Sequence, residues 1–133
     1  MPGDFFDSNV LLYVASPLDA RADRAERIVS GGGAVSVQVL NEVTHVARRK
    51  FVMDWFEIEQ FLTGLRAFVT VHDLTLLTHA EAMRLVRSFR LAWYDALNVA
   101  AALLAGCDRL LTEDMHHGLV IDDRLRIENP FLG

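Results

Sequence analysis

The sequence predicts an open, mainly parallel α/β sheet, because short apolar strands alternate with amphipathic helices along the chain. No internal repeat, low-complexity tract or long linker interrupts the 133 residues, so we expect one domain over residues 1–133. Hydrophobic residues make up 52% of the composition, which excludes a disordered chain.

Capping and turn residues set the expected boundaries of each element. Ser8 and Asp54 are each expected to cap a helix. Thr78 and Glu81 have the spacing of a capping box, and Gly106 is expected to stop the helix before it. The expected strands are 5–7, 34–36, 69–71, 109–112 and 125–127, and the expected helices are 8–15, 18–29, 37–50, 55–68, 79–90 and 94–104.

Charge and cysteine content exclude several classes of protein. The net charge of −5 is not that of a protein that binds nucleic acid by bulk electrostatics, so contact with nucleic acid would have to be local. The single cysteine, Cys107, allows no intrachain disulfide and is expected to be a packed core thiol. No secretory signal is visible, and the apolar segment 96–106 is about half of the ~20 residues that a membrane helix needs. We therefore expect a cytoplasmic protein without a membrane span.

Four carboxylates interrupt apolar runs at expected strand ends or helix starts, namely Asp7, Glu42, Asp95 and Asp114. Ligands of open α/β sheets bind at the carboxyl ends of the strands. Carboxylates gathered in one cleft raise each other's pKa, and Mg²⁺ or Mn²⁺ relieves that repulsion because both prefer oxygen ligands. The pattern therefore predicts an acidic metal site, and helix capping is the competing interpretation.

Other chemistries fit the sequence less well. The triplet at 31–33 precedes a strand, so no dinucleotide or phosphate loop is predicted. Glu42 with His45, and Glu113 with His116, have the spacing of di-iron bundles, but such a site needs two further helical glutamates in a four-helix core. A phospho-acceptor receiver domain needs a lysine after a late strand, and the only lysine, Lys50, lies in an expected helix.

Five short motifs occur in order over nearly the whole chain: Phe6-Asp7-Ser8-Asn9-Val10-Leu11-Leu12-Tyr13, Asn41-Glu42-Val43, Tyr94-Asp95-Ala96-Leu97, Leu111-Thr112-Glu113-Asp114-Met115 and Asn129-Pro130-Phe131. Together they resemble the PIN domain family, and within it the VapC-like toxins of bacterial toxin–antitoxin pairs. The resemblance implies a three-layer α/β/α sandwich with a central, mainly parallel sheet. It also implies Mg²⁺- or Mn²⁺-dependent ribonuclease activity, a homodimer, and inhibition by a cognate antitoxin whose tail covers the acidic cleft.

The resemblance also assigns roles to the carboxylates. Asp7 and Asp95 match the firmest metal ligands of the family. Glu42 would complete the ligand shell or orient a water, and Asp114 would bind metal directly or through water. The expected function is hydrolysis of RNA phosphodiester bonds by a metal-dependent endoribonuclease, the toxin of such a pair. The alternative is a catalytically inactive PIN-like module that binds RNA or protein.

Neighbouring polar residues match positions that organise such a site. Ser8, Asn9 and Thr112 would hold the carboxylates by hydrogen bonds. Glu113 precedes Asp114, and the sequence leaves open which of the two faces the cleft. It also leaves open the number of metal ions.

Two further groups of residues are candidates for binding or contact. Arg84, Arg87 and Arg90 are expected on one helix face, where they would contact RNA phosphates or an acidic antitoxin tail, or simply be solvated. Four aromatic residues are expected in the core or in a dimer interface: Trp55, Phe56, Phe61 and Phe68.

Overall fold

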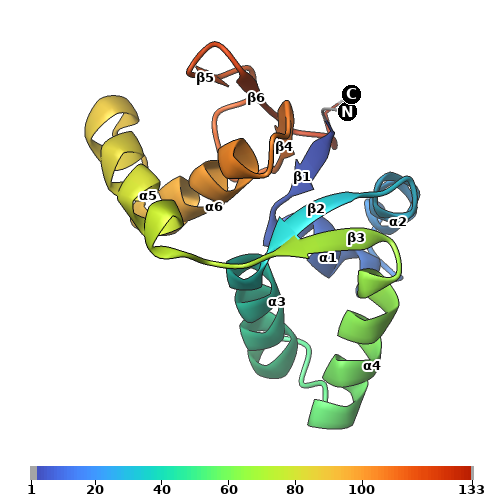
Figure 1. The fold of residues 1–133 in the computed structure, drawn as a ribbon. Helices are drawn as coiled ribbons and strands as arrows, with labels where there is room; N and C mark the ends of the chain where they lie inside the picture. The colour runs from blue at the N-terminus through green and yellow to red at the C-terminus, as the bar shows by residue number, and fades with distance from the viewer. Residues whose placement is uncertain (1–2, 133) are drawn as a thin grey trace.

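The computed structural model describes residues 3–132 and contains a six-stranded sheet with helices on both faces (Figure 1). The strands follow the order β3-β2-β1-β4-β6-β5, and only the pairing of β5 with β6 is antiparallel. The strands are β1 (Asp4–Phe6), β2 (Gly33–Ser36), β3 (Val69–His72), β4 (Arg109–Leu111), β5 (Val120–Ile121) and β6 (Leu125–Glu128). The helices are α1 (Ser8–Val14), α2 (Ala22–Ser30), α3 (Val37–Arg49), α4 (Trp55–Arg66), α5 (Leu76–Phe89) and α6 (Trp93–Leu104).

The direction of the chain across the sheet reverses beside β1. The chain steps outward from β1 to β2 and β3, and then returns past β1 to form β4. Right-handed crossovers therefore place α5 and α6, which form this return connection, on the face opposite α1 and α2. Figure 1 shows α5 and α6 together on one side of the sheet and α1 and α2 on the other. Such a reversal opens a crevice at the carboxyl ends of β1 and β4, where α/β proteins bind ligands. The predicted fold class is confirmed.

The core includes residues on the helices of both faces of the sheet, and α6 contributes the longest buried stretch. Phe5, Phe6 and Leu110 on the central strands have no exposed surface. Every residue of α6 from 96 to 103 is buried, so this helix is apolar on nearly its whole circumference. The one polar side chain in that stretch is Asn98, which is 2% exposed. Helix α6 is therefore held firmly against the sheet that it covers.

Two helix starts differ from the prediction. Asp7, not Ser8, caps α1, and its side chain accepts a hydrogen bond from the backbone N–H of Ser8 at 2.7 Å. Helix α5 begins three residues earlier than predicted, because Thr75 caps it and Thr78 completes the capping box. Thr75 and Thr78 lie three residues apart and both carry a hydroxyl that can cap a helix. The sequence pattern was therefore compatible with a start of α5 after either residue.

Three more local predictions were wrong. Helix α2 begins at Ala22, four residues late, because the side chain of Asp19 accepts from the backbone N–H of Arg21 at 2.8 Å and forms a turn. Arg90 has a φ of 55° and ends α5 in a left-handed conformation, so it does not continue the helix face of Arg84 and Arg87. The short strand β5 was not predicted.

Three of the four aromatic residues do not form core. Trp55 is 61% exposed, Phe56 71% and Phe68 51%, whereas Phe61 is partly buried and packs against the core. The core prediction is wrong for the three exposed residues, and the dimer interface stays a prediction. Cys107 is buried, as predicted. Among residues 3–132, no helix has the length and apolarity required to cross a membrane.

Candidate active site

Four separate elements carry the predicted site carboxylates to the crevice beside β1. Asp7 directly follows β1 and caps α1, and Asp95 lies in the first turn of α6. Glu42 lies in α3, which begins where β2 ends and is capped there by Ser36. Asp114 follows β4 by three residues. The elements that begin or end at the carboxyl edge of the sheet therefore bring these acids from distant parts of the sequence.

Asp7 is the most buried of the four and is surrounded by hydrogen-bond donors. It is 3% exposed. Its Oδ1 accepts from the backbone N–H of Ser8 at 2.7 Å and from Nδ2 of Asn98 at 3.0 Å. Its Oδ2 accepts from Oγ1 of Thr112 at 2.7 Å and from Nδ2 of Asn9 at 3.3 Å. Four donors therefore fix the orientation of this nearly buried carboxylate.

Asn9 and Thr112 join Asp7 to Asp114. The amide of Asn9 donates to Oγ1 of Thr112 at 3.1 Å and to Oδ2 of Asp114 at 3.0 Å. Thr112 also accepts from the backbone N–H of Asp114 at 3.1 Å, and the backbone N–H of Glu113 donates to Oδ1 of Asn9 at 3.3 Å. The first turn of α1 and the loop after β4 are thus held together by one polar network.

Glu42 is oriented from two directions. Oγ of Ser8 donates to its Oε2 at 2.9 Å, and Nε2 of Gln38 donates to its Oε1 at 3.3 Å. Gln38 lies four residues before Glu42 on α3, the spacing at which two side chains share a helix face. Ser8, Asn9 and Thr112 therefore all donate hydrogen bonds to site carboxylates.

The electrostatics indicate that the four acids influence one another. The pKa of Asp7 is raised to about 6, chiefly by burial and to a smaller extent by the charges of Glu42 and Asp114, against the opposing hydrogen bonds from Thr112 and Ser8. Burial is also the main reason that the pKa of Asp95 lies above its usual value, and Asp114 and Glu42 again contribute. Both carboxyls respond to the same two neighbours, so the four charges share one region.

Asp114 and its neighbour Glu113 have different surroundings. Asp114 accepts from Asn9 and acts on the pKa of both Asp7 and Asp95. Glu113 instead accepts from the hydroxyl of Tyr13 and pairs with Arg21 at 3.5 Å. The geometry therefore directs Asp114 toward the other acids and leaves Glu113 in a separate surface contact.

A hard divalent cation fits the chemistry of these donors. All four are carboxylates, and their mutual repulsion is what a cation would relieve. In residues 3–132, no three Asp, Glu, His or Cys side chains are gathered closely enough to be a ready-made ion site. The amide of Asn9 instead bridges Asp7 and Asp114, and at 3.3 Å it makes the longest of the contacts to Asp7. A cation at Asp7 would have to displace this donor first.

Sequence reasoning missed two residues, and the contact of the α5 arginines with RNA or an antitoxin stays a prediction. Asn98 and Gln38 were not predicted, although each lies one helical turn from a site acid. Asn98 comes three residues after Asp95, and Gln38 comes four residues before Glu42. Arg84 is held by Asp122 at 2.6 Å and by Glu81 at 3.1 Å. Among the side chains described, none of the site carboxylates bonds to Arg84, Arg87 or Arg90.

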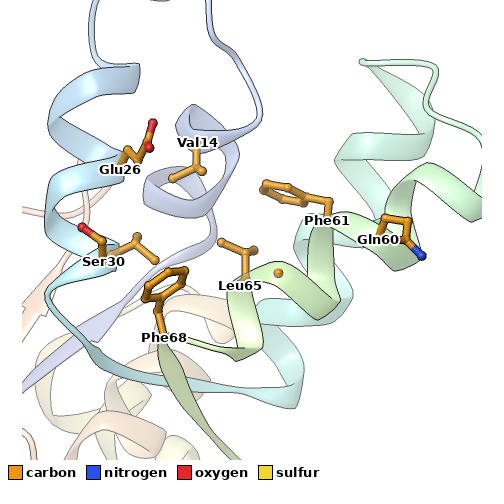
Figure 2. Close-up of a pocket in the computed structure, with 9 residues that line it drawn as sticks. Val14, Glu26, Ser30, Gln60, Phe61, Leu65 and Phe68 are labelled. Carbon is orange, nitrogen blue, oxygen red and sulfur yellow. The ribbon is translucent and has the colours of Figure 1, made fainter.

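A separate apolar groove lies between α1, α2 and α4 (Figure 2). It has a volume of about 450 Å³. Figure 2 shows Phe61 and Leu65 of α4 facing Val14 of α1, with Phe68 below them. None of the four site carboxylates lines it. The molecule therefore has an acidic crevice and an apolar groove at different places.

Comparisons with known proteins agree with this architecture. Residues 5–118 match the family described as PIN domain. A toxin–antitoxin complex from Klebsiella pneumoniae is 18% identical, with a TM-score of 0.73 over 97% of this chain and 98% of that one. VapC20 of Mycobacterium tuberculosis, a sarcin–ricin loop cleaving toxin, is 22% identical, with a TM-score of 0.64 over 81% and 87%. VapBC2 of Rickettsia felis, bound to a promoter DNA fragment, is 14% identical, with a TM-score of 0.68 over 95% and 98%. Curated protein sequences gave no match.

Proposed function

Because the chain belongs to the PIN domain family, we propose that it is a metal-dependent endoribonuclease, the toxin of a toxin–antitoxin pair. The observation that carries the proposal is the group of four carboxylates that share one region at the carboxyl edge of the sheet. Nuclease chemistry fits this family, and several proteins of similar fold are toxins or toxin–antitoxin complexes.

Each side chain has a part in the proposed mechanism. Asp7, Glu42, Asp95 and Asp114 would hold Mg²⁺ or Mn²⁺. When bound, such an ion polarises the phosphodiester and lowers the pKa of an attacking water. Thr112 and Ser8 keep Asp7 and Glu42 in fixed orientations, which reduces the rearrangement that binding requires. Asn9 would release Asp7 and keep its bond to Asp114.

The test is cleavage of RNA by the purified protein. Total cellular RNA is incubated with Mg²⁺ or Mn²⁺, with a chelator, and with an Asp95→Asn variant. We expect discrete fragments that need the metal and the intact acid. Cleavage that persists in chelator, or in the variant at the unaltered rate, would contradict the proposal.

A second candidate is an inactive PIN-like module that binds RNA or protein. It is favoured by the absence, among residues 3–132, of three carboxylates already gathered around one point. It predicts no binding of Mn²⁺ at millimolar concentration, whereas the nuclease predicts binding. A calorimetric titration separates the two.

We propose a small antitoxin as the protein partner, and a homodimer as the assembly. The groove of Figure 2 offers an apolar surface where a helix of such a partner would pack, away from the carboxylates that its tail would cover. Phe61→Lys should therefore weaken complex formation and leave RNA cleavage unchanged. Exposed Trp55 and Phe56 support a further contact between copies, which sedimentation of the Trp55→Ser variant would test. We place this activity in the cytoplasm.

A further inference from the structure

Asn98 is a buried amide that joins α6 to the end of β1. It is 2% exposed, and its Nδ2 donates to Oδ1 of Asp7 at 3.0 Å. Asp95 lies three residues before it on α6, a spacing that puts both side chains on one face of the helix. One face of α6 therefore carries both Asp95, which lies at the acidic crevice, and Asn98, which donates a hydrogen bond to Asp7.

The orientation of this amide follows from its partner. An ionised carboxylate only accepts hydrogen bonds, so the NH₂ group of Asn98 must point toward Asp7. The carbonyl oxygen Oδ1 then points elsewhere, and it is the one buried side-chain polar atom in residues 3–132 without a hydrogen-bond partner. When Asn98 donates to Asp7, its own carbonyl oxygen is therefore left as an unsatisfied acceptor in the core.

An unsatisfied buried carbonyl works against stability. Leaving such a group without a partner costs about 1–3 kcal/mol. An apolar side chain of similar size would avoid that cost, and all of its neighbours in α6 from 96 to 103 are apolar. Helix packing alone therefore does not account for an amide at this place, whereas a requirement to hold Asp7 does.

We propose that Asn98 is a positioning residue that fixes Asp7 relative to Asp95, so that both can bind one divalent cation. The inference rests on the proposed metal-dependent function. Asp7 is carried by the β1–α1 junction and Asp95 by α6, and Asn98 is the one hydrogen bond described between α6 and the Asp7 carboxylate. Loss of the amide would let the positions of Asp7 and Asp95 vary independently, and the affinity for the cation would fall.

The test separates positioning from packing with three variants of the intact protein at two neighbouring positions. Asn98→Leu removes the amide and keeps the number and branching of the side-chain heavy atoms, and Asn98→Ala repeats the loss without added bulk. Val99→Ala is the matched control, because Val99 is fully buried on the same helix and makes no hydrogen bond to Asp7. Each protein is titrated with Mn²⁺ by calorimetry, and its thermal unfolding is followed in chelator.

We expect both Asn98 variants to bind Mn²⁺ roughly 10-fold or more weakly while they remain folded, the size of effect known for residues that orient metal ligands. The Mn²⁺ concentration for half-maximal RNA cleavage should rise by the same factor. Val99→Ala should lower the unfolding temperature and bind Mn²⁺ within twofold of the unaltered protein.

Two results would overturn the inference alone: both Asn98 variants binding Mn²⁺ within twofold of the unaltered protein, or Val99→Ala losing as much affinity as they do. If the unaltered protein itself binds no Mn²⁺, the proposed metal centre fails, and the inference fails with it. Mn²⁺ binding by the unaltered protein therefore shows whether the proposed function or only the role of Asn98 is wrong.

Discussion

Two groups of carboxylates in this molecule differ in what lies beside them. On the strands, Asp4 and Glu128 both pair with Arg109, at 2.7 and 3.1 Å. In the crevice, none of the four site carboxylates has an Arg, Lys or His partner within residues 3–132. The strand carboxylates are neutralised by the chain itself, whereas the site carboxylates are left with amides, hydroxyls and one another.

The difference shows what each group contributes to the fold. Exposed ion pairs such as Asp4 with Arg109 stabilise a protein by about 0–1 kcal/mol, and salt screens them. Asp7 is instead buried, with Glu42 and Asp114 near it, so its ionised form works against folding. The strand pairs stabilise the fold modestly, whereas the crevice carboxylates have no cationic side chain beside them in residues 3–132.

The largest expected effect is the loss of cleavage in Asp7→Asn. The asparagine keeps the shape of the side chain and removes its charge, so RNA cleavage should fall by about 1,000-fold or more, as expected when several kcal/mol of metal-assisted stabilisation are lost. Rates of RNA cleavage at saturating Mn²⁺ measure this. Asp4→Asn is the matched control from the strand group and should cleave at the unaltered rate. A fully active Asp7→Asn protein would remove the mechanism.

A second prediction concerns pH and stability without metal. The pKa of Asp7 rises from 3.8 to about 6 on folding, so its favourable contribution is complete below pH 4 and is lost as pH rises through about 6. A shift of that size corresponds to about 3 kcal/mol. Urea unfolding in chelator should therefore show stability falling between pH 4 and 7, and Asp7→Asn should flatten that fall. Equal pH profiles for the two proteins would contradict the assigned cause.

A third prediction uses the difference between two arginines of α5. Arg84 is already paired with Glu81 and Asp122, whereas no ion pair is described for Arg87. In the inactive Asp7→Asn background, Arg87→Glu should weaken RNA binding about tenfold and lower its salt dependence, as for the loss of one phosphate contact. Arg84→Glu should have a smaller effect. Gel-shift titrations at two salt concentrations check this, and equal affinities for both variants and their parent would remove α5 from the RNA surface.

The smallest effect is expected for the strand pairs. Arg109→Gln breaks its contacts with both Asp4 and Glu128, yet it should lower the free energy of unfolding by at most about 1 kcal/mol. The difference should shrink in 1 M salt, where exposed charges are screened. Urea unfolding at low and high salt measures it. A loss of several kcal/mol that salt does not change would show that this cluster matters more to the fold than the comparison allows.

Sequence patterns predicted the sheet and its acids because these depend on local signals. Alternating strands and helices predicted the architecture, and Asp7 was singled out as a carboxylate at a strand end. Patterns did not separate Thr75 from Thr78 as a helix cap, because both offer the same hydroxyl. They also left Asp114 and Glu113 equivalent, since the orientation of Glu113 depends on Tyr13 and Arg21, which lie far away in sequence.

Asn98 was missed for a related reason. A single amide in an apolar helix has no pattern of its own, and its partner Asp7 lies 91 residues away. The spacing to Asp95 could have drawn attention to it, because residues three apart on a helix share a face. Sequence reasoning therefore could not predict this contact, because it joins elements that are far apart in the sequence.

The most direct test of the comparison is a calorimetric titration of the metal-free protein with Mn²⁺, beside Asp7→Asn and Asp4→Asn. We expect binding by the unaltered protein, equal binding by Asp4→Asn, and at least about tenfold weaker binding by Asp7→Asn. Absence of binding at millimolar Mn²⁺, or equal affinity in Asp7→Asn, would contradict the claim that the unpaired carboxylates form a cation site.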